Sequence, residues 1–456
     1  MTTKHGLERS LKRLDIFALS FGAMIGWSWV ALIGDVISRG GTVGALIATV
    51  GVGVVIIALG MIYGELASAM PDVGGEHVYS LRALGPIASF TCTWAIVFCY
   101  VSVNAFEAIA LPTVLENLFP SLGRIALWDV NGGQVFLDHA LIGAVCSLIL
   151  MAINIRGVKI AAFLQTIVVA LILCAGLVLF AGVGVAADSA NMTPLLPRGA
   201  VGVLAAAAMI PFFMVGFDVI PQAAEEIDLP PKRIGALVVW SIVAAIAWYL
   251  MIVLAAGLLL SDAGRQNADL STIEAARAAW GHKGATLLLI GGIAGILTSW
   301  NSFMIAGSRA LFALAESGMA PAWFARVHPK YHTPVNAIIF CGLAGAVAPF
   351  LGRQALIWFV DAGSFALMFT YFVVAWSFVV LRKREPDLER PYKAPLGRAL
   401  GWFGMLASLG LGALYLPGMP AALIWPQEWA LVVAGLVLGA GVYLSSPRSK
   451  KTSSEG

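Results

Sequence analysis

Two apolar segments of the chain carry residues that interrupt helices, and interrupted membrane helices can bind charged groups. The first, residues 20–28, reads SFGAMIGWS, with Gly22 and Gly26 in its middle. The second, residues 209–221, reads MIPFFMVGFDVIP, and each of its prolines removes a backbone donor. A broken helix exposes N–H groups that attract a carboxylate and carbonyl groups that attract an ammonium group or a cation. A zwitterionic amino acid supplies both charged groups.

Acidic residues lie within or at the edges of apolar segments. An ionisable group inside a membrane costs at least ~2.5 kcal/mol on insertion scales, so each is a functional candidate. Asp218 lies at the second interruption, and we interpret it as a working carboxylate. Glu65 is interpreted as a structural or proton-linked residue. Asp35, Glu107 and Asp361 lie near the ends of their segments and are interpreted as solvated interfacial charges.

Hydroxyl groups cluster midway along a later apolar segment, at Thr298, Ser299 and Ser302. Together with first-segment carbonyls they could hold sodium, because hard cations prefer oxygen ligands. The alternative is that these hydroxyls bond to their own helix. A second alternative concerns Gly22 and Gly26, whose G-x-x-x-G spacing is also a common helix-packing motif.

The elements that position these residues are membrane helices. The chain has 456 residues, of which 60% are hydrophobic and 12% charged, whereas soluble domains carry about 25% charged residues. Apolar runs of about 20 residues span a bilayer, and inside a bilayer they must be helical. We therefore expect an all-α, polytopic protein with about twelve transmembrane helices, at residues 16–36, 43–69, 88–110, 139–155, 160–184, 201–222, 234–260, 285–314, 334–351, 356–380, 399–418 and 428–446.

The charges of the loops predict the topology. Most loop lysines and arginines fall on one side of the predicted membrane, so we expect a multi-pass protein of the cytoplasmic membrane with both termini cytoplasmic. The six histidines lie in tails, loops or span edges. Neither a nucleophile nor a metal cluster lies at mid-depth, so the sequence disfavours an enzyme and indicates no cofactor. The basic runs are explained by topology. We therefore expect the lipid bilayer as a partner and expect no nucleic acid.

Four groups of residues resemble the signatures of the amino acid–polyamine–organocation superfamily of permeases. Residues 63–79 (YGELASAMPDVGGEHVY) are similar to its second helix and first cytoplasmic loop, and residues 212–226 to its sixth helix. Residues 308–337 resemble its eighth helix and the following loop, and residues 384–392 (REPDLERPY) its loop after the tenth helix. The resemblance covers nearly the whole chain.

The resemblance implies a five-plus-five inverted repeat (LeuT-like) with two further helices and alternating access around one substrate. The two interrupted segments then open the two repeats. The implied layout is one transmembrane domain over residues 1–446, followed by a cytoplasmic tail at 447–456. Within the domain, repeat one covers 14–184, repeat two 199–381 and the extra helices 399–446.

The resemblance also assigns site residues. Backbone of the first helix would meet the substrate carboxylate, sixth-helix carbonyls would meet the amine, and side chains of the third and eighth helices would line the pocket. Together with Gly216 and Asp218 of the second interruption, the substrate-binding candidates are Met24, Ile25, Gly26, Trp27, Ser28, Asn104, Phe212, Phe213, Met214, Trp300 and Phe303. The candidates for coupling are Glu65, Asp218, Thr298, Ser299 and Ser302.

The sequence departs from the family pattern at two places. Trp27 and Ser28 follow Gly26 where small residues are usual, which reshapes the site. Some relatives carry a lysine midway along the fifth helix that replaces a sodium ion, and that position falls on Ile172 here. A lysine-based proton coupling of that kind is therefore disfavoured.

We therefore expect a secondary active transporter for amino acids, with a co-transported proton or sodium ion as a possible partner. The substrate carries an amine, because no lysine or arginine lies mid-span to neutralise the acids. A permease for ethanolamine, polyamines or other organic amines is the first alternative. A nutrient sensor with a transporter fold is the weakest, because the tails are too short for a signalling domain.

Overall fold

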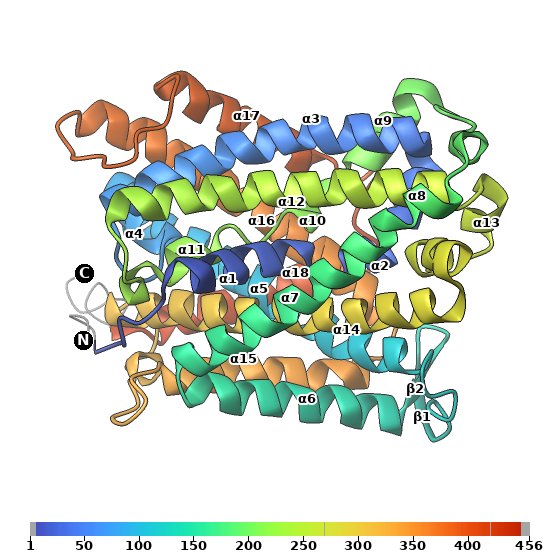
Figure 1. The fold of residues 1–456 in the computed structure, drawn as a ribbon. Coiled ribbons are helices and arrows are strands. Elements are labelled where there is room, and N and C mark those ends of the chain that lie inside the picture. The colour runs from blue at the N-terminus through green and yellow to red at the C-terminus, as the bar shows by residue number, and fades with distance from the viewer. Residues whose placement is uncertain (1–5, 269, 420, 448–456) are drawn as a thin grey trace.

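The computed structural model describes residues 6–268, 270–419 and 421–447, and most of them lie in helices that run side by side (Figure 1). Within these ranges, nine helices are long and apolar enough to cross a membrane, so the chain is a polytopic membrane protein. The helices are α1 (Arg13–Ile25), α2 (Ser28–Ala31), α3 (Ile33–Ala69), α4 (Glu76–Leu84), α5 (Pro86–Leu115), α6 (Leu137–Ile155), α7 (Val158–Ala181), α8 (Val183–Ala186), η1 (Ser189–Met192), α9 (Gly199–Ala207), α10 (Ile210–Phe213), α11 (Val219–Gln222), η2 (Ala224–Glu226), α12 (Pro231–Leu259), α13 (Asp262–Gln266), α14 (Ser271–Glu316), η3 (Ala322–Ala325), α15 (Val335–Val347), η4 (Ala348–Leu351), α16 (Ala355–Arg384), α17 (Arg398–Ala413) and α18 (Gln427–Leu444).

Every expected span overlaps a helix, but some of these helices are short. The span expected at 201–222 is divided among α9, α10 and α11. The span expected at 334–351 consists of the 13 residues of α15 followed by η4. The span expected at 399–418 is the 16-residue helix α17. Proline, glycine and loop residues make the helices shorter than the apolar segments that contain them. A count of apolar residues gives the length of the segment and not that of the helix.

Two long helices contain sharp kinks at glycine. Gly41 (φ 72°) lies inside α3, in the stretch 37–42 that the sequence predicted to be a loop. Gly281 (φ 63°) lies inside α14. Positive φ is accessible to glycine and strained for other residues. Each glycine therefore lets the chain kink sharply while both flanks stay helical.

The packing of the helices sets the depth of each in the bundle. The most deeply buried spans are α5 and α14, which pack against each other, and α16 also packs on α5. The helix α3 lies along α12, as Figure 1 shows. At the periphery α18 is the least buried span, and its exposed leucine and valine side chains suit contact with lipid chains.

The loop between α5 and α6 contains a β-hairpin that the all-α expectation missed. Strands β1 (Ala126–Val130) and β2 (Gly133–Phe136) pair antiparallel. The turn between them is Asn131 (φ 52°) and Gly132 (φ 80°), and Asn-Gly is the preferred pair for such a two-residue turn. The dipeptide was therefore a local signal for this hairpin.

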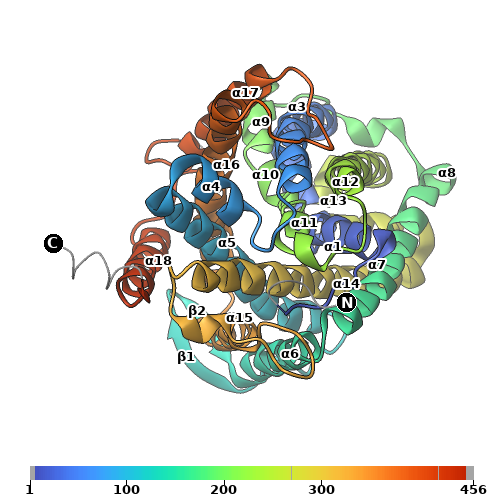
Figure 2. The ribbon, with the colours of Figure 1, turned by 90° about the vertical axis from the view of Figure 1, so that its left-hand side faces the viewer.

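The bundle has two ends, which we name by their landmarks. The α4 end carries α4 and α11 together with the start of α1, and Figure 2 looks directly at it. The hairpin end, on the opposite side of Figure 1, carries the hairpin and α13. Both ends of the described chain lie at the α4 end (Figure 1).

Candidate substrate and coupling site

The first interruption lies between α1 and α2, at Gly26. This residue has φ 34° and ψ −139°, a conformation that is strained for any residue with a Cβ. Its carbonyl oxygen contacts the backbone of Gly295 on α14 so closely that a Cβ at Gly295 would clash with it. Gly22, one turn earlier, packs instead against Gln165 and Val169 of α7. The G-x-x-x-G pair therefore does both jobs: Gly22 packs helices and Gly26 breaks one.

Some backbone polar groups at this interruption are hydrogen-bonded and others have no hydrogen-bond partner among the described residues. The hydroxyl of Tyr249 on α12 donates to the carbonyl of Met24 at 2.8 Å. The N–H of Gly26 donates to the carbonyl of Gly22 at 3.1 Å. Among the described residues, the N–H groups of Trp27 and Ser28 have no recorded hydrogen bond. Two adjacent open N–H groups favour an anionic ligand.

The second interruption touches the first. Gly216, between α10 and α11, has φ 131°, and a Cβ on it would lie 2.6 Å from the Cβ of Ala23 and 2.9 Å from the backbone N of Met24. Phe213 stacks on Tyr249, with ring centroids 5.3 Å apart. The two breaks therefore lie side by side, although almost two hundred residues separate them in the chain.

A cavity of ≈ 760 Å³ lies toward the hairpin end. Its floor contains Trp27, Phe106, Phe212 and Phe213. Phe106 and Phe212 meet edge to face, with centroids 5.8 Å apart. The charged residues on the walls are Asp35, Arg39, Glu116, Arg353 and Asp361.

The aromatic floor separates this cavity from a buried acid, Glu107 on α5. Glu107 is 2% exposed, so its interpretation as a solvated interfacial charge was wrong. One carboxyl oxygen accepts a hydrogen bond from the hydroxyl of Ser299 on α14, and the other has no partner. A Cβ on Gly26 would lie 3.2 Å from that hydroxyl. Glu107 is thus linked to the first interruption through Ser299. It is a candidate for the site that the sequence analysis had placed at the membrane interface.

Three predicted pocket residues lie behind the site. Asn104, Trp300 and Phe303 are buried and are not among the residues that line the cavity. Phe303 stacks on Tyr100 of α5, with centroids 5.4 Å apart. The backbone carbonyl of Asn104 and the indole nitrogen of Trp300 each lie 3.6 Å from a Cβ built on Gly345 of α15. These residues therefore occupy the interface of α5, α14 and α15.

Asp218 lies on the α4 side of the second interruption. Its side chain is fully buried, and one carboxyl oxygen accepts a hydrogen bond from the hydroxyl of Tyr371 on α16 at 3.2 Å. The rings of Tyr63, Phe217 and Tyr371 pack together around it, with centroid separations of 5.2 to 5.8 Å. This aromatic cluster closes the site toward the α4 end.

Two of the three predicted coupling hydroxyls meet carbonyls of the first helix, whereas Ser299 donates to Glu107 and to carbonyls of its own helix. Thr298 donates to Gly22 and Ser302 donates to Leu19, each at 3.0 Å. The amide of Gln165 on α7 donates to the carbonyl of Ala18 at 3.2 Å. These donors hydrogen-bond to the first-helix carbonyls that were expected to hold a cation.

A buried chain of amides supports Gln165. Its Nε2 also donates to the hydroxyl of Ser302 at 2.9 Å, and its Oε1 accepts from Asn301 at 3.0 Å. Asn154 of α6 donates in turn to Asn301 at 3.0 Å. The residue of α7 that reaches these first-helix carbonyls is therefore Gln165, seven positions before Ile172.

Among the described residues no group of three or more His, Cys, Asp or Glu could hold a metal ion.

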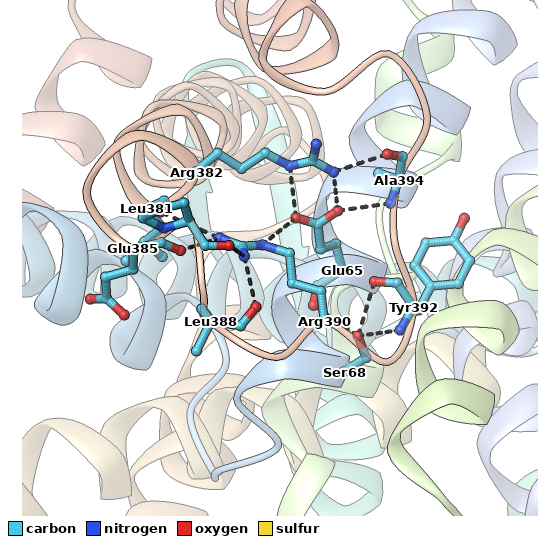
Figure 3. A network of polar contacts seen from close by, with 10 residues as sticks. Glu65, Ser68, Leu381, Arg382, Glu385, Leu388, Arg390, Tyr392 and Ala394 are labelled. Carbon is cyan, nitrogen blue, oxygen red and sulfur yellow. Dashed lines mark hydrogen bonds and ion pairs between the residues drawn. The ribbon is translucent and has the colours of Figure 1, made fainter.

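Glu65, near the end of α3, is held by two arginines (Figure 3). Arg382 of α16 donates from Nε at 2.9 Å, and the Nε of Arg390 lies 3.0 Å from the same carboxyl group. The N–H of Ala394 donates to it at 2.7 Å. The arginines come from the end of α16 and the loop after it, so the expectation that no basic residue neutralises the interior acids fails at Glu65. These contacts favour the structural alternative for this residue.

Comparisons with known proteins agree with the geometry. The model of the amino acid permease family matches residues 11–439. The chain is 26% identical to the methylthioribose transporter of Bacillus subtilis (strain 168), covering 96% of this chain and 93% of that protein. It is 26% identical to the branched-chain amino acid permease of the same organism, over 85% and 84% of the two chains.

A plant relative is also similar over most of the chain. The vacuolar cationic amino acid transporter 4 of Arabidopsis thaliana is 27% identical, covering 84% of this chain and 65% of that protein. These relatives are transporters and not enzymes, and a family match of this length spans both interruptions and the cavity floor. The chain belongs to the amino acid permease family.

Proposed function

We propose that the protein is a secondary active transporter that moves an amino acid across the cytoplasmic membrane by alternating access. The observation that carries this proposal is the contact between the two helix interruptions, where Gly216 packs against Ala23 and Met24 beneath the cavity floor. Such paired interruptions place opposite partial charges around one small volume. The structure has its cavity at the hairpin end and an aromatic cluster toward the α4 end, as expected of an outward-facing state.

The substrate carboxylate binds the open N–H groups of Trp27 and Ser28 in this proposal. The backbone of Met24, Ile25 and Gly26 shapes the same turn. The amine lies toward the carbonyls of residues 212–214, at the turn that Gly216 permits, and Glu107 supplies a carboxyl group nearby. Phe212 closes over the substrate from the cavity side. Asn104, Trp300 and Phe303 act here by packing behind the site.

The architecture proposed for this function is the five-plus-five inverted repeat with twelve transmembrane helices. Repeat one covers 14–184, repeat two 199–381, and the two extra helices 399–446. The position of both chain ends at the α4 end supports an even number of crossings. The loop charges support a cytoplasmic α4 end. The tail proposed at 447–456 lies outside the described residues except for Pro447.

For coupling we favour a proton over sodium. The carbonyls of Ala18, Leu19 and Gly22 already accept hydrogen bonds from Gln165, Ser302 and Thr298. A sodium ion would have to share these oxygens with the donors already bound to them, and the amide of Gln165 is fixed there by its own buried chain of hydrogen bonds. We therefore assign Thr298 and Ser302 to positioning the first helix, and we keep Asp218 as the coupling acid.

The alternative within transport is a permease for ethanolamine, polyamines or other organic amines. The observation in its favour is that Glu107 and Asp218 are both buried and form no ion pair among the described residues, because two such acids suit a substrate that carries amines and no carboxylate. A nutrient sensor remains the weakest alternative, since no feature of the cavity favours a sensor over a transporter.

The experiment is uptake into proteoliposomes of a panel of labelled compounds: leucine, arginine, ethanolamine, putrescine and methylthioribose. Sodium and pH gradients are varied separately. Saturable uptake of leucine or arginine that persists when potassium replaces sodium supports the proposal. Uptake of ethanolamine or putrescine alone would establish the alternative, and uptake of methylthioribose alone would contradict an amine-containing substrate.

A further inference from the structure

A second buried acid lies at the α4 end, outside the predicted set. Glu76 is the first residue of α4 and its side chain is fully buried. The side-chain amide of Gln222, the last residue of α11, donates to one of its carboxyl oxygens. Among the described residues, neither the other carboxyl oxygen nor the amide oxygen of Gln222 has a hydrogen-bond partner. The ion pairs among the described residues do not include Glu76.

The backbone fixes this contact between α4 and α11. The N–H of Gly74 donates to the carbonyl of Gln222 at 3.2 Å. Gly75 lies so close to Pro221 that a Cβ there would be 2.9 Å from the proline Cβ. Asp218 lies one turn before Gln222 on the same segment. Glu76 is therefore held directly behind the interruption, at the point where the loop after α3 meets the segment after the second break.

Among the described residues, the titratable groups that couple to Glu76 are hydroxyls, a thiol and a carboxyl. They are the hydroxyls of Tyr63 on α3, Tyr79 on α4, Tyr100 on α5 and Tyr371 on α16, the thiol of Cys92 on α5, and the carboxyl of Asp218. Burial raises the pKa of Glu76 well above its usual range, and the carboxyl of Asp218 raises it further.

A proton on Glu76 satisfies the two atoms that lack a partner. A carboxylic acid and a carboxamide form a ring of two hydrogen bonds, in which the amide N–H and the acid O–H each donate to the other group. An ionised Glu76 would instead leave the buried amide oxygen of Gln222 without a donor, and its own second oxygen would need a neighbouring hydroxyl such as that of Tyr63 or Tyr79. The amide oxygen of Gln222 therefore favours the neutral acid in this state.

We propose that Glu76 is a proton-carrying residue of the transport cycle, an inference that rests on the proposed function. It holds a proton while α11 covers it and the α4 end is closed. When the α4 end opens, α11 separates from α4, water reaches the carboxyl group, and the O–H bond breaks to release the proton to the cytoplasm. Asp218, which precedes Gln222 on the side of the cavity floor, passes a proton from the substrate side back to the carboxylate.

The transport test compares two processes in proteoliposomes, with the panel compound that the wild type takes up fastest. In the wild type an inward proton gradient drives accumulation, and a pH dye inside the vesicles records proton entry with the substrate. In Glu76→Gln, which imitates the protonated side chain, the gradient should no longer drive accumulation or proton entry, while exchange of internal for external substrate stays measurable. Glu316→Gln, which neutralises an exposed acid at the end of α14, should accumulate substrate as the wild type does.

A spectroscopic test does not depend on transport. The infrared spectrum of the purified protein at neutral pH should contain the band of a protonated carboxylic acid, and the part of this band due to Glu76 should be missing from Glu76→Gln and present in Glu316→Gln. Glu76→Asp keeps an ionisable group and should retain proton-driven accumulation with a displaced pH profile.

The outcomes separate this inference from the proposed function. Proton-driven accumulation by Glu76→Gln equal to that of the wild type would overturn the inference, as would identical infrared spectra or a wild type that transports with no response to the pH gradient. A wild type that takes up no panel compound would contradict the proposed function, and the infrared spectra would then decide whether Glu76 carries a proton.

Discussion

The carboxyl group of Glu107 on α5 accepts a hydrogen bond from the hydroxyl of Ser299 on α14, directly beside Gly26. The residues come from α5, α14 and the interruption between α1 and α2. This contact places a carboxyl group next to the open N–H groups and carbonyls of the interruption, where a substrate amine is proposed to bind.

Glu107→Gln should weaken binding of an amine-bearing substrate. A hydrogen bond to a charged group contributes about 1.5–3 kcal/mol, so KM should rise roughly 10- to 100-fold with a smaller change in kcat. Asp361→Asn on the cavity wall is the matched control and should change KM much less, because its side chain is partly exposed. Uptake kinetics in proteoliposomes measure both, and equal effects of the two variants would remove Glu107 from the binding site.

Asp218→Asn should abolish uptake while the amount of folded protein in the membrane stays normal. The substitution keeps the shape of the side chain and the hydrogen bond from Tyr371, but it removes the proton-binding group. Uptake is compared with the quantity of monodisperse protein after size-exclusion chromatography. Wild-type uptake by the variant would show that Asp218 takes no part in coupling.

Trp27→Gly should broaden or shift the substrate preference. The indole packs against Gly292 of α14 and forms part of the cavity floor, so its removal enlarges the space above the interruption. The ratio of uptake rates across the panel is the readout. Trp323→Gly, at an exposed tryptophan in η3, should leave the ratio unchanged; the same ratio in both variants and the wild type would mean that Trp27 does not contact the substrate.

Glu65→Gln should reduce stability rather than coupling. Glu65 is buried between Arg382 and Arg390, and removal of one partner from a buried ion pair costs about 3–5 kcal/mol. The apparent Tm in detergent should fall by several degrees. Glu385→Gln breaks the exposed pair with Arg82, which contributes about 0–1 kcal/mol, and should barely change Tm. An unchanged Tm in Glu65→Gln, with loss of proton-driven uptake, would restore a coupling role.

The parts of the site that were predictable are those encoded within one segment. Gly26 and Gly216 interrupt helices because of their own backbone freedom, and Pro211 and Pro221 remove donors wherever they stand. The contacts between distant segments were not predictable in this way. Ser299 meets Glu107 across 192 positions and Gln222 meets Glu76 across 146, and these pairings depend on how whole helices pack.

One further miss has an identifiable cause. The position of Glu107 near the end of an apolar run suggested solvent contact, but α5 extends to Leu115 and keeps this residue inside the bundle. Hydropathy shows where an apolar run ends, but the helix that contains the run can continue beyond that point.

The central claim is that an amino acid binds where the two helix interruptions meet. A cryo-EM structure of the protein with a saturating concentration of the transported amino acid tests it most directly. The account predicts density between Gly26 and Gly216, with the carboxylate at the N–H groups of Trp27 and Ser28 and the amine toward residues 212–214. Density elsewhere in the bundle, with this space empty, would contradict it.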